Sequence, residues 1–224
     1  MSTIGKRLLD IRKTIPAGVE LVAVSKFHPV EALAEAYEAG QRIFGESRVQ
    51  ELYAKIPQLP NDIRWHFIGH LQTNKVRQLV GTRRISLIES IDSERLLQAI
   101  DAESVRAGIE SRVLLQVHVA QEDTKFGFTP EELDEFFRCG AYRNLKATRL
   151  CGIMGMASNT DDTERVRADF AAIAACRKRT LELAPNLTEF NIVSMGMSDD
   201  YPTAIAEGST LVRIGTAIFG ERNY

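Results

Sequence analysis

Short apolar runs rich in β-branched residues alternate along this chain with longer amphipathic stretches. That exchange is typical of β/α units, in which each strand is followed by a helix. The apolar runs predict eight strands, at residues 19–25, 42–44, 65–68, 85–88, 113–117, 150–154, 189–193 and 210–214. The amphipathic stretches predict a helix before the first strand and helices at residues 29–39, 47–56, 74–80, 93–107, 130–139, 160–183 and 202–206.

The character of these runs favours a closed parallel barrel. Runs such as residues 21–24 and 113–115 are continuously apolar, as are strands buried on both faces. Thr129 and Pro130 provide a typical helix start, a cap followed by a proline in the first turn. Eight β/α repeats predict one α/β domain over residues 1–224, a single (β/α)8 TIM barrel with an additional N-terminal helix. An open doubly wound sheet is the alternative, because the second and fourth strands are weak.

Composition narrows the class of protein. With 44% hydrophobic and 26% charged residues, the 224-residue chain can bury a core without a metal or a disulfide. Lys and Arg number 28 against 30 for Asp and Glu, and this even mixture argues against a nucleic-acid partner. The three cysteines form no C-x-x-C pair, and the chain shows no signal peptide or membrane span, so we expect a cytoplasmic protein.

Polar residues collect directly after the predicted strands. In a barrel these positions form one rim, at the carboxyl ends of the strands, where this fold carries its chemistry. The segments are Ser25-Lys26-Phe27-His28, Gly45-Glu46-Ser47, Gly69-His70-Leu71, Glu89-Ser90, His118, Gly155-Met156, residues 194–200 and Gly215-Thr216-Ala217.

The loops after the seventh and eighth strands predict a phosphate site. Small residues and hydroxyls there let backbone donors approach an anion, although the same residues also serve tight turns and helix caps. Arg213 is unusual because it lies inside an apolar strand, where a charge needs either a structural carboxylate or a ligand. The candidate phosphate residues are Ser194, Gly196, Ser198, Gly215 and Thr216.

Lys26 follows the first strand and is a candidate nucleophile. A lysine that loses solvent at the barrel mouth has a lowered pKa, and its neutral amine can attack an aldehyde to form a Schiff base. A solvated lysine at the start of a loop is the alternative. Together with a phosphate site and an interior arginine, Lys26 predicts a site for an aldehyde that carries a phosphate, and pyridoxal phosphate meets all three requirements.

Histidines offer weaker candidates. His66 and His70 stand four residues apart, a spacing that aligns metal ligands on a helix but not on a strand, so we expect no metal site. His118 is more often a packed histidine than an acid or base. The chain contains no nucleotide-binding glycine loop and no serine-hydrolase motif.

Longer motifs point to a known family. They are Val22-Ala23-Val24-Ser25-Lys26, Phe44-Gly45-Glu46, residues 65–75, residues 194–200 and residues 213–220. These motifs resemble those of the pyridoxal phosphate homeostasis proteins, and the resemblance covers nearly the whole chain. It implies a barrel similar to the N-terminal domain of alanine racemase, with pyridoxal phosphate bound as an internal aldimine.

The resemblance also implies roles for individual residues. Lys26 would form the aldimine, and Arg213 would face the pyridine nitrogen, which weakens the ring as an electron sink. The family commonly has Asn where this chain has Ser47, which leaves any contact made by that Asn in doubt. The phosphate would be held by Ser194, Gly196, Gly215 and Thr216, partly through backbone donors.

The resemblance implies a carrier rather than an enzyme. Racemases built on this barrel take a second acid/base, a tyrosine, from an added domain of the partner subunit, and this chain stops at Tyr224 without that domain. We therefore expect a monomer that binds and buffers pyridoxal phosphate and delivers it to apo-enzymes without robust turnover.

Two other functions stay open. A weak pyridoxal-phosphate-dependent amino-acid racemase would use His70, His118 or a tyrosine as its second base. A cofactor-free aldolase would use Lys26 to form a Schiff base with a phosphorylated sugar. If Lys125 were the attachment site, the argument from the first strand would fail while the fold stood.

Overall fold

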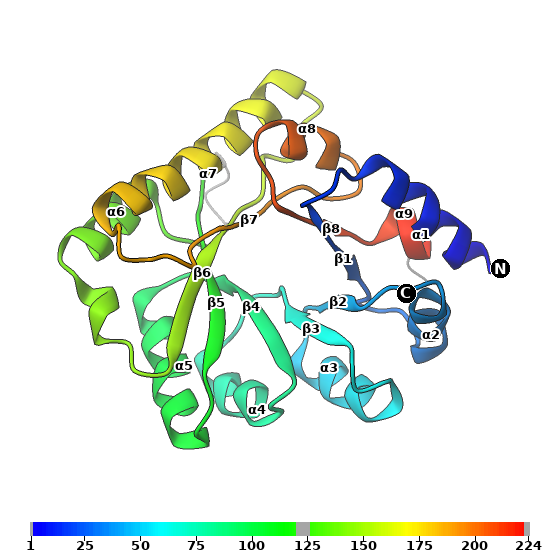
Figure 1. The fold of residues 1–224 in the computed structure, drawn as a ribbon, viewed down its shortest axis with the longest axis horizontal. Coiled ribbons are helices and arrows are strands. Elements are labelled where there is room, and N and C mark those ends of the chain that lie inside the picture. The colour runs from blue at the N-terminus through cyan, green and yellow to red at the C-terminus, as the bar shows by residue number, and fades with distance from the viewer. Residues whose placement is uncertain (1, 120–125, 222–224) are drawn as a thin grey trace.

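The computed structural model describes residues 2–119 and 126–221, and this part of the chain forms a barrel of parallel strands surrounded by helices (Figure 1). Each strand pairs with the next along the chain, and the last pairs with the first. The predicted (β/α)8 barrel is therefore confirmed, and the open-sheet alternative is wrong. The described strands are β1 (Glu20–Val24), β2 (Ile43–Glu46), β3 (Arg64–Phe67), β4 (Ile85–Ile91), β5 (Ser111–Gln116), β6 (Thr148–Met154), β7 (Ile192–Ser194) and β8 (Leu211–Ile214).

Helices connect the strands around the outside of the barrel (Figure 1). Thr129 caps one of them as predicted, and its hydroxyl accepts a hydrogen bond from the Glu132 N–H while Glu132 accepts one from the Thr129 N–H. No helix among the described residues is both long and apolar enough to span a bilayer. The helices are α1 (Thr3–Thr14), α2 (Val30–Glu38), α3 (Val49–Lys55), α4 (Val76–Gly81), α5 (Glu94–Ala107), α6 (Pro130–Arg138), α7 (Thr163–Leu183), α8 (Tyr201–Ala206) and α9 (Thr216–Phe219), with 3-10 turns η1 (Ile56–Gln58), η2 (Thr73–Lys75) and η3 (Ala141–Asn144).

Two strands run at least two residues further than the apolar pattern predicts, and β7 runs one residue further to include Ser194, which was also expected on the rim. β2 includes Gly45 and Glu46, and β4 continues through Glu89 and Ser90. The expectation that these residues follow their strands, on the rim, is therefore wrong. A carboxylate interrupts each apolar run in the sequence, but the folded barrel supplies partners that let both carboxylates be buried.

Inside the barrel, a polar layer lies on top of an apolar one. Glu89, Gln116 and Arg213 are buried, and each stands two residues beyond an apolar inner residue of the same strand. Residues two apart on a strand share a face, so these polar side chains also point inward, nearer to the carboxyl ends of the strands. The apolar inner layer consists of Val22, Ile43, Leu87, Leu114, Cys151 and Leu211, and Met154, which packs with them, lies level with Gln116 and Ser194.

Gly152 in β6 marks a place where the sheet leaves no room for a side chain. The register between β5 and β6 shifts here, because Val113 pairs with Leu150 while Leu114 pairs with Gly152. Gly152 has a φ of 150°, and a Cβ atom at this position would lie 1.9 Å from the Ile192 carbonyl oxygen in β7. The bulge therefore depends on glycine.

We expect Gly152→Ala to lower the free energy of unfolding by about 3 kcal/mol, because the methyl group collides with backbone atoms that cannot move independently. Gly81→Ala is the matched control. Gly81 lies in α4, and a Cβ atom there would have no neighbouring atom within 4 Å, so alanine should raise the free energy of unfolding by about 0.5 kcal/mol. Urea unfolding of the two variants measures both effects, and equal stabilities would contradict the argument.

Candidate functional site

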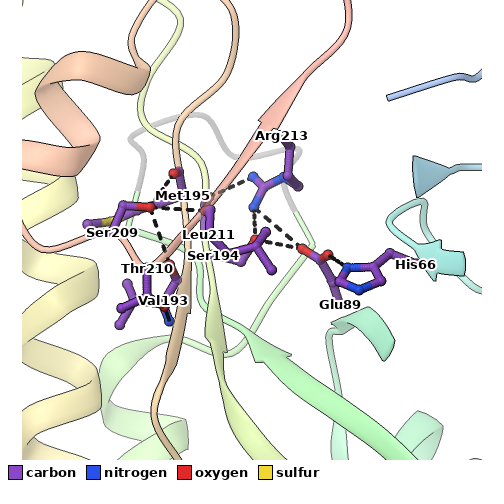
Figure 2. Close-up of polar contacts among 10 residues, drawn as sticks. His66, Glu89, Val193, Ser194, Met195, Ser209, Thr210, Leu211 and Arg213 are labelled. Carbon is purple, nitrogen blue, oxygen red and sulfur yellow. Dashed lines mark hydrogen bonds and ion pairs between the residues drawn. The ribbon is translucent and has the colours of Figure 1, made fainter. Parts of the chain in front are cut away.

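A chain of buried polar side chains crosses the barrel interior (Figure 2). His66 Nδ1 in β3 lies 2.6 Å from Glu89 Oε1 in β4, and the Ser194 hydroxyl in β7 donates to Glu89 Oε2 at 2.6 Å. Arg213 in β8 donates through Nη1 to Ser194 Oγ at 2.5 Å and through Nη2 to the Gly155 carbonyl oxygen at 3.1 Å. Two pairs of strands that are far apart in sequence, β3 with β4 and β7 with β8, therefore contribute to one hydrogen-bonded group.

Opposite charges within this group offset the free-energy cost of burying them. Burial by itself would raise the pKa of the Glu89 carboxyl, but the hydrogen bond and charge of His66 and the charge of Arg213 outweigh it, so the pKa lies below its ordinary value. Burial lowers the pKa of Arg213, and the negative charges of Glu89 and Asp200 oppose that shift. Arg213 Nη1 and Glu89 Oε2 are 3.8 Å apart. The interior thus holds a paired guanidinium and carboxylate.

Ser209 and Thr210 hold the end of β7 against the start of β8 (Figure 2). The buried Ser209 Oγ lies 2.8 Å from the Met195 carbonyl oxygen, 3.0 Å from that of Leu211 and 3.3 Å from that of Val193. A hydroxyl has one proton, so it donates to one of these oxygens at a time. Thr210 Oγ1 accepts from the Val193 N–H at 2.8 Å. These bonds fix β7 relative to β8, and so they fix where the loops after the two strands begin along the barrel axis.

The loops after β7 and β8 each contain a glycine that is packed closely against a neighbouring element. Gly196 has a φ of 97°, and a Cβ atom there would lie 2.6 Å from a side-chain atom of α8. Its carbonyl oxygen accepts from the Arg213 N–H at 2.9 Å. Gly215 precedes α9, and a Cβ atom there would lie 3.2 Å from the Val24 carbonyl oxygen in β1. Thr216, the first residue of α9, is exposed. The pattern did not predict α9, which is only one turn long.

Lys26 lies half-buried in the turn directly after β1. Two contacts place this turn beside the loop after β8. Gly215 approaches the Val24 backbone, and the His28 ring stacks on Phe219 of α9 with centroids 4.9 Å apart. Lys26 and the expected phosphate loop are therefore neighbours at the seam where β1 meets β8.

The predicted residues lie at one end of the barrel, at two depths. Lys26, Gly196 and Gly215 lie in the loops at the rim, and Thr216 begins α9 beside them. Ser194 and Arg213 lie one level deeper, in the polar layer, and the carboxylate that partners Arg213 is Glu89. Because the Ser194 hydroxyl donates to Glu89, its part in holding a phosphate stays a prediction.

Sequence reasoning missed two members of the site. Glu89 was expected on the rim, and His66 was considered only as a metal ligand, yet both are buried in the polar layer. The available signal was their strand position, since Glu89 stands two residues beyond the inner residue Leu87 and therefore faces inward. The described residues contain no group of three His, Cys, Asp or Glu side chains arranged to hold a metal.

The other histidines lie elsewhere. His70 Nδ1 lies 2.9 Å from Asp92 Oδ2, and the His70 ring stacks on Phe126 with centroids 3.8 Å apart. His118 Nε2 is buried without a hydrogen-bond partner. His70 is thus an oriented, partly exposed imidazole near the rim. Lys125 and Tyr224 lie outside the described residues.

The low pKa of Glu89 gives a test of the interior group. A carboxyl whose pKa is lowered by folding stabilises the protein above its unfolded pKa of about 4.3, and that contribution is lost as pH falls through the folded value. At pH 7 we expect Glu89→Gln to cost about 3 kcal/mol in the free energy of unfolding, because Arg213 loses its charged partner. Between about pH 5 and pH 3 the gap to wild type should narrow. Denaturant unfolding across this range measures it.

The exposed Glu35→Gln in α2 is the matched control for loss of a carboxylate, and it should change stability by less than about 0.5 kcal/mol. A gap between wild type and Glu89→Gln that stayed constant from pH 7 to pH 3 would contradict the assignment of an ionised, paired Glu89.

Known proteins are similar to this chain in sequence and in fold. The family model for the alanine racemase N-terminal domain matches residues 1–223. A pyridoxal phosphate homeostasis protein of Schizosaccharomyces pombe is 40% identical, covering 99% of this chain and 94% of its own, and one of Aquifex aeolicus is 39% identical, covering 92% and 88%. PipY of Synechococcus elongatus, solved with pyridoxal phosphate bound, is 37% identical with a TM-score of 0.89, covering 97% of this chain and all of its own. The chain belongs to the pyridoxal phosphate homeostasis protein family, built on the alanine racemase N-terminal fold.

Proposed function

We propose that this protein binds pyridoxal phosphate through a Schiff base to Lys26, buffers the cofactor and delivers it to apo-enzymes. Two comparisons support the ligand: PipY was solved with pyridoxal phosphate bound, and the curated relatives are named for pyridoxal phosphate homeostasis. The single observation that carries the proposal is the placement of the Lys26 turn beside the loop after β8, above the buried Arg213 guanidinium.

The residues present fit this cofactor. A phosphate needs backbone donors that side chains do not cover, and Gly196 and Gly215 carry no side chain, at positions where a Cβ atom would collide with α8 and β1. An aldehyde needs an amine nearby, and Lys26 lies at the adjoining strand end. When bound, pyridoxal phosphate would supply an aldehyde carbon for reversible attachment to an amine.

Each residue has a defined task in this proposal. Lys26 would supply the amine that adds to the aldehyde carbon, with a C=N bond replacing the C=O bond and one water molecule leaving. Gly196, Gly215 and Thr216 would hold the phosphate, largely through backbone N–H groups. Ser194 is also predicted to hold the phosphate, and its hydroxyl forms hydrogen bonds with Glu89 and Arg213 beneath the loops.

Arg213 favours the carrier over the enzyme. Its guanidinium is buried and paired with Glu89, so it is a donor rather than an acceptor toward a pyridine nitrogen. A donor at this position disfavours protonation of the ring and so gives little support to carbanion chemistry. A weak racemase is the second candidate, because Asp92 orients the His70 imidazole near the rim, where it could act as a base.

The cysteines support a cytoplasmic location for the protein. Cys139, Cys151 and Cys176 are all free thiols, as expected in a reducing cytoplasm, where we place the protein. Delivery to apo-enzymes and a monomeric state rest on the family resemblance and stay predictions.

Borohydride reduction after incubation with pyridoxal phosphate tests the attachment. We expect a visible absorption band in the wild type and, after reduction and peptide mapping, a pyridoxyl adduct on Lys26. Lys26→Ala should show no band, because it lacks the amine, while Lys178→Ala, at an exposed lysine of α7, serves as a matched control and should behave as wild type. An adduct on another lysine in the wild type would refute the assignment.

Amino-acid turnover separates carrier from enzyme. Because Arg213 disfavours a protonated ring, we expect racemisation of alanine by the loaded protein to stay near the rate of free pyridoxal phosphate. Chiral chromatography of the products measures it. Fast racemisation that is lost both in Lys26→Ala and in His70→Gln would replace the carrier proposal with the racemase.

A further inference from the structure

The turn that carries Lys26 has a strained backbone. The Ser25 carbonyl oxygen accepts from the His28 N–H at 3.1 Å, which closes a four-residue turn with Lys26 and Phe27 at its centre. Phe27 has a φ of 67°, while Lys26 is not among the residues with positive φ. This combination is typical of a type II turn, whose third position normally takes Gly or Asn. A bulky side chain in this conformation must be held there by its surroundings.

Three side chains along α3, from its N-cap Arg48 to its last residue Lys55, hold this turn. Glu51 Oε1 accepts from the Phe27 N–H at 2.6 Å, and Lys55 Nζ donates to the Ser25 carbonyl oxygen at 2.9 Å. The Arg48 guanidinium lies over the Phe27 ring, 4.8 Å from its centroid. Arg48, Glu51 and Lys55 are three and four residues apart, so they share one face of the helix. Backbone atoms on both sides of Lys26 are therefore fixed from a single direction.

Buried charges hold these three side chains in place. Lys55 is 5% exposed, and its Nζ donates to Glu46 Oε1 at 2.8 Å and to Glu51 Oε1 at 2.6 Å. The Ser25 hydroxyl donates to the same Glu46 oxygen at 2.7 Å. Burial raises the pKa of Glu46, and the charge and hydrogen bond of Lys55 oppose that shift. Glu46 Oε2 is buried without a hydrogen-bond partner.

Burying these charged side chains costs more free energy than a purely structural contact would require. A buried lysine with two carboxylates stabilises a fold no better than apolar side chains of the same volume, and an unpartnered carboxylate oxygen adds a further cost. The group nevertheless lies directly behind the one turn that carries the candidate nucleophile. Strain that the surrounding structure maintains at such a place indicates a functional constraint.

We infer that Arg48, Glu51 and Lys55, anchored by Glu46, form a clamp that positions Lys26 for covalent attachment of an aldehyde by holding its turn in the strained conformation. The inference rests on the proposed attachment at Lys26 and assigns that site positioning residues on α3. Without the clamp, Phe27 leaves the left-handed region and the backbone that directs Lys26 rotates. Attachment then becomes slower and weaker, although the loops after β7 and β8 still bind phosphate.

Glu51→Ala is the direct test, because this half-buried side chain can be removed without emptying the Lys55 site of its other carboxylate. We expect the rate of adduct formation with pyridoxal phosphate, followed by visible absorption and confirmed by borohydride trapping on Lys26, to fall about tenfold, the effect of losing a charge-assisted hydrogen bond. Gln50→Ala, an exposed neighbour on α3, is the matched control and should behave as wild type. Glu51→Gln keeps an acceptor and should remain within about threefold of wild type.

A second substitution separates positioning from general damage. Glycine adopts a positive φ without strain, so Phe27→Gly no longer needs the clamp. We expect the double variant Phe27→Gly, Glu51→Ala to recover most of the lost attachment rate, although it lacks more contacts than either single variant. Thermal unfolding of all variants identifies any that fail to fold.

The outcomes distinguish this inference from the proposed function. Equal rates for Glu51→Ala and Gln50→Ala, with a normal wild-type adduct on Lys26, would overturn the clamp and leave the proposed function standing. A slow Glu51→Ala that Phe27→Gly does not restore would also overturn it, because the effect would then not act through turn strain. Absence of a Lys26 adduct in the wild type would remove the proposed function and the clamp together.

Discussion

The buried guanidinium of Arg213 imposes a requirement that several parts of the barrel must meet at once. A charge withdrawn from water needs an opposite charge and a full set of acceptors close to it. β4 supplies the carboxylate of Glu89, β7 supplies the hydroxyl of Ser194, and the loop after β6 supplies the Gly155 carbonyl oxygen. These strands must therefore close in one register, and the same closure gives the mouth of the barrel its polar floor.

Two buried ionic groups lie on opposite sides of the barrel wall. The group around Glu89 is inside, whereas the group of Glu46, Lys55 and Glu51 lies between the wall and α3. The inner group consists of side chains from strands, and it holds the guanidinium of Arg213, which is also a strand residue. The outer group supports a turn, where the backbone has more freedom and strain has to be maintained by side chains. The two groups together define the site from below and from behind.

The sequence predicted the architecture better than the contacts. Apolar runs located all the strands because burial on both faces leaves a clear pattern, and strand ends were misplaced where a buried carboxylate such as Glu89 continues the strand. The position of Lys26 and Gly215 at the rim was predictable because the carboxyl ends of barrel strands meet there. The pairing of Arg213 with Glu89 depends on the register of distant strands. The left-handed Phe27 could not be foreseen, because phenylalanine is not a residue of such turns.

The seam between β1 and β8 gives the site a dependence on complete folding. Lys26 lies in the turn directly after the first strand and Gly215 in the loop after the last, so the two are brought together only when the final strand closes the sheet. In a partly folded chain the residues of the site are present but are not brought together. A ligand that bridges the seam binds the closed barrel alone and, by mass action, shifts the folding equilibrium toward it. Supply of the ligand would then set how much of the chain persists in the native state.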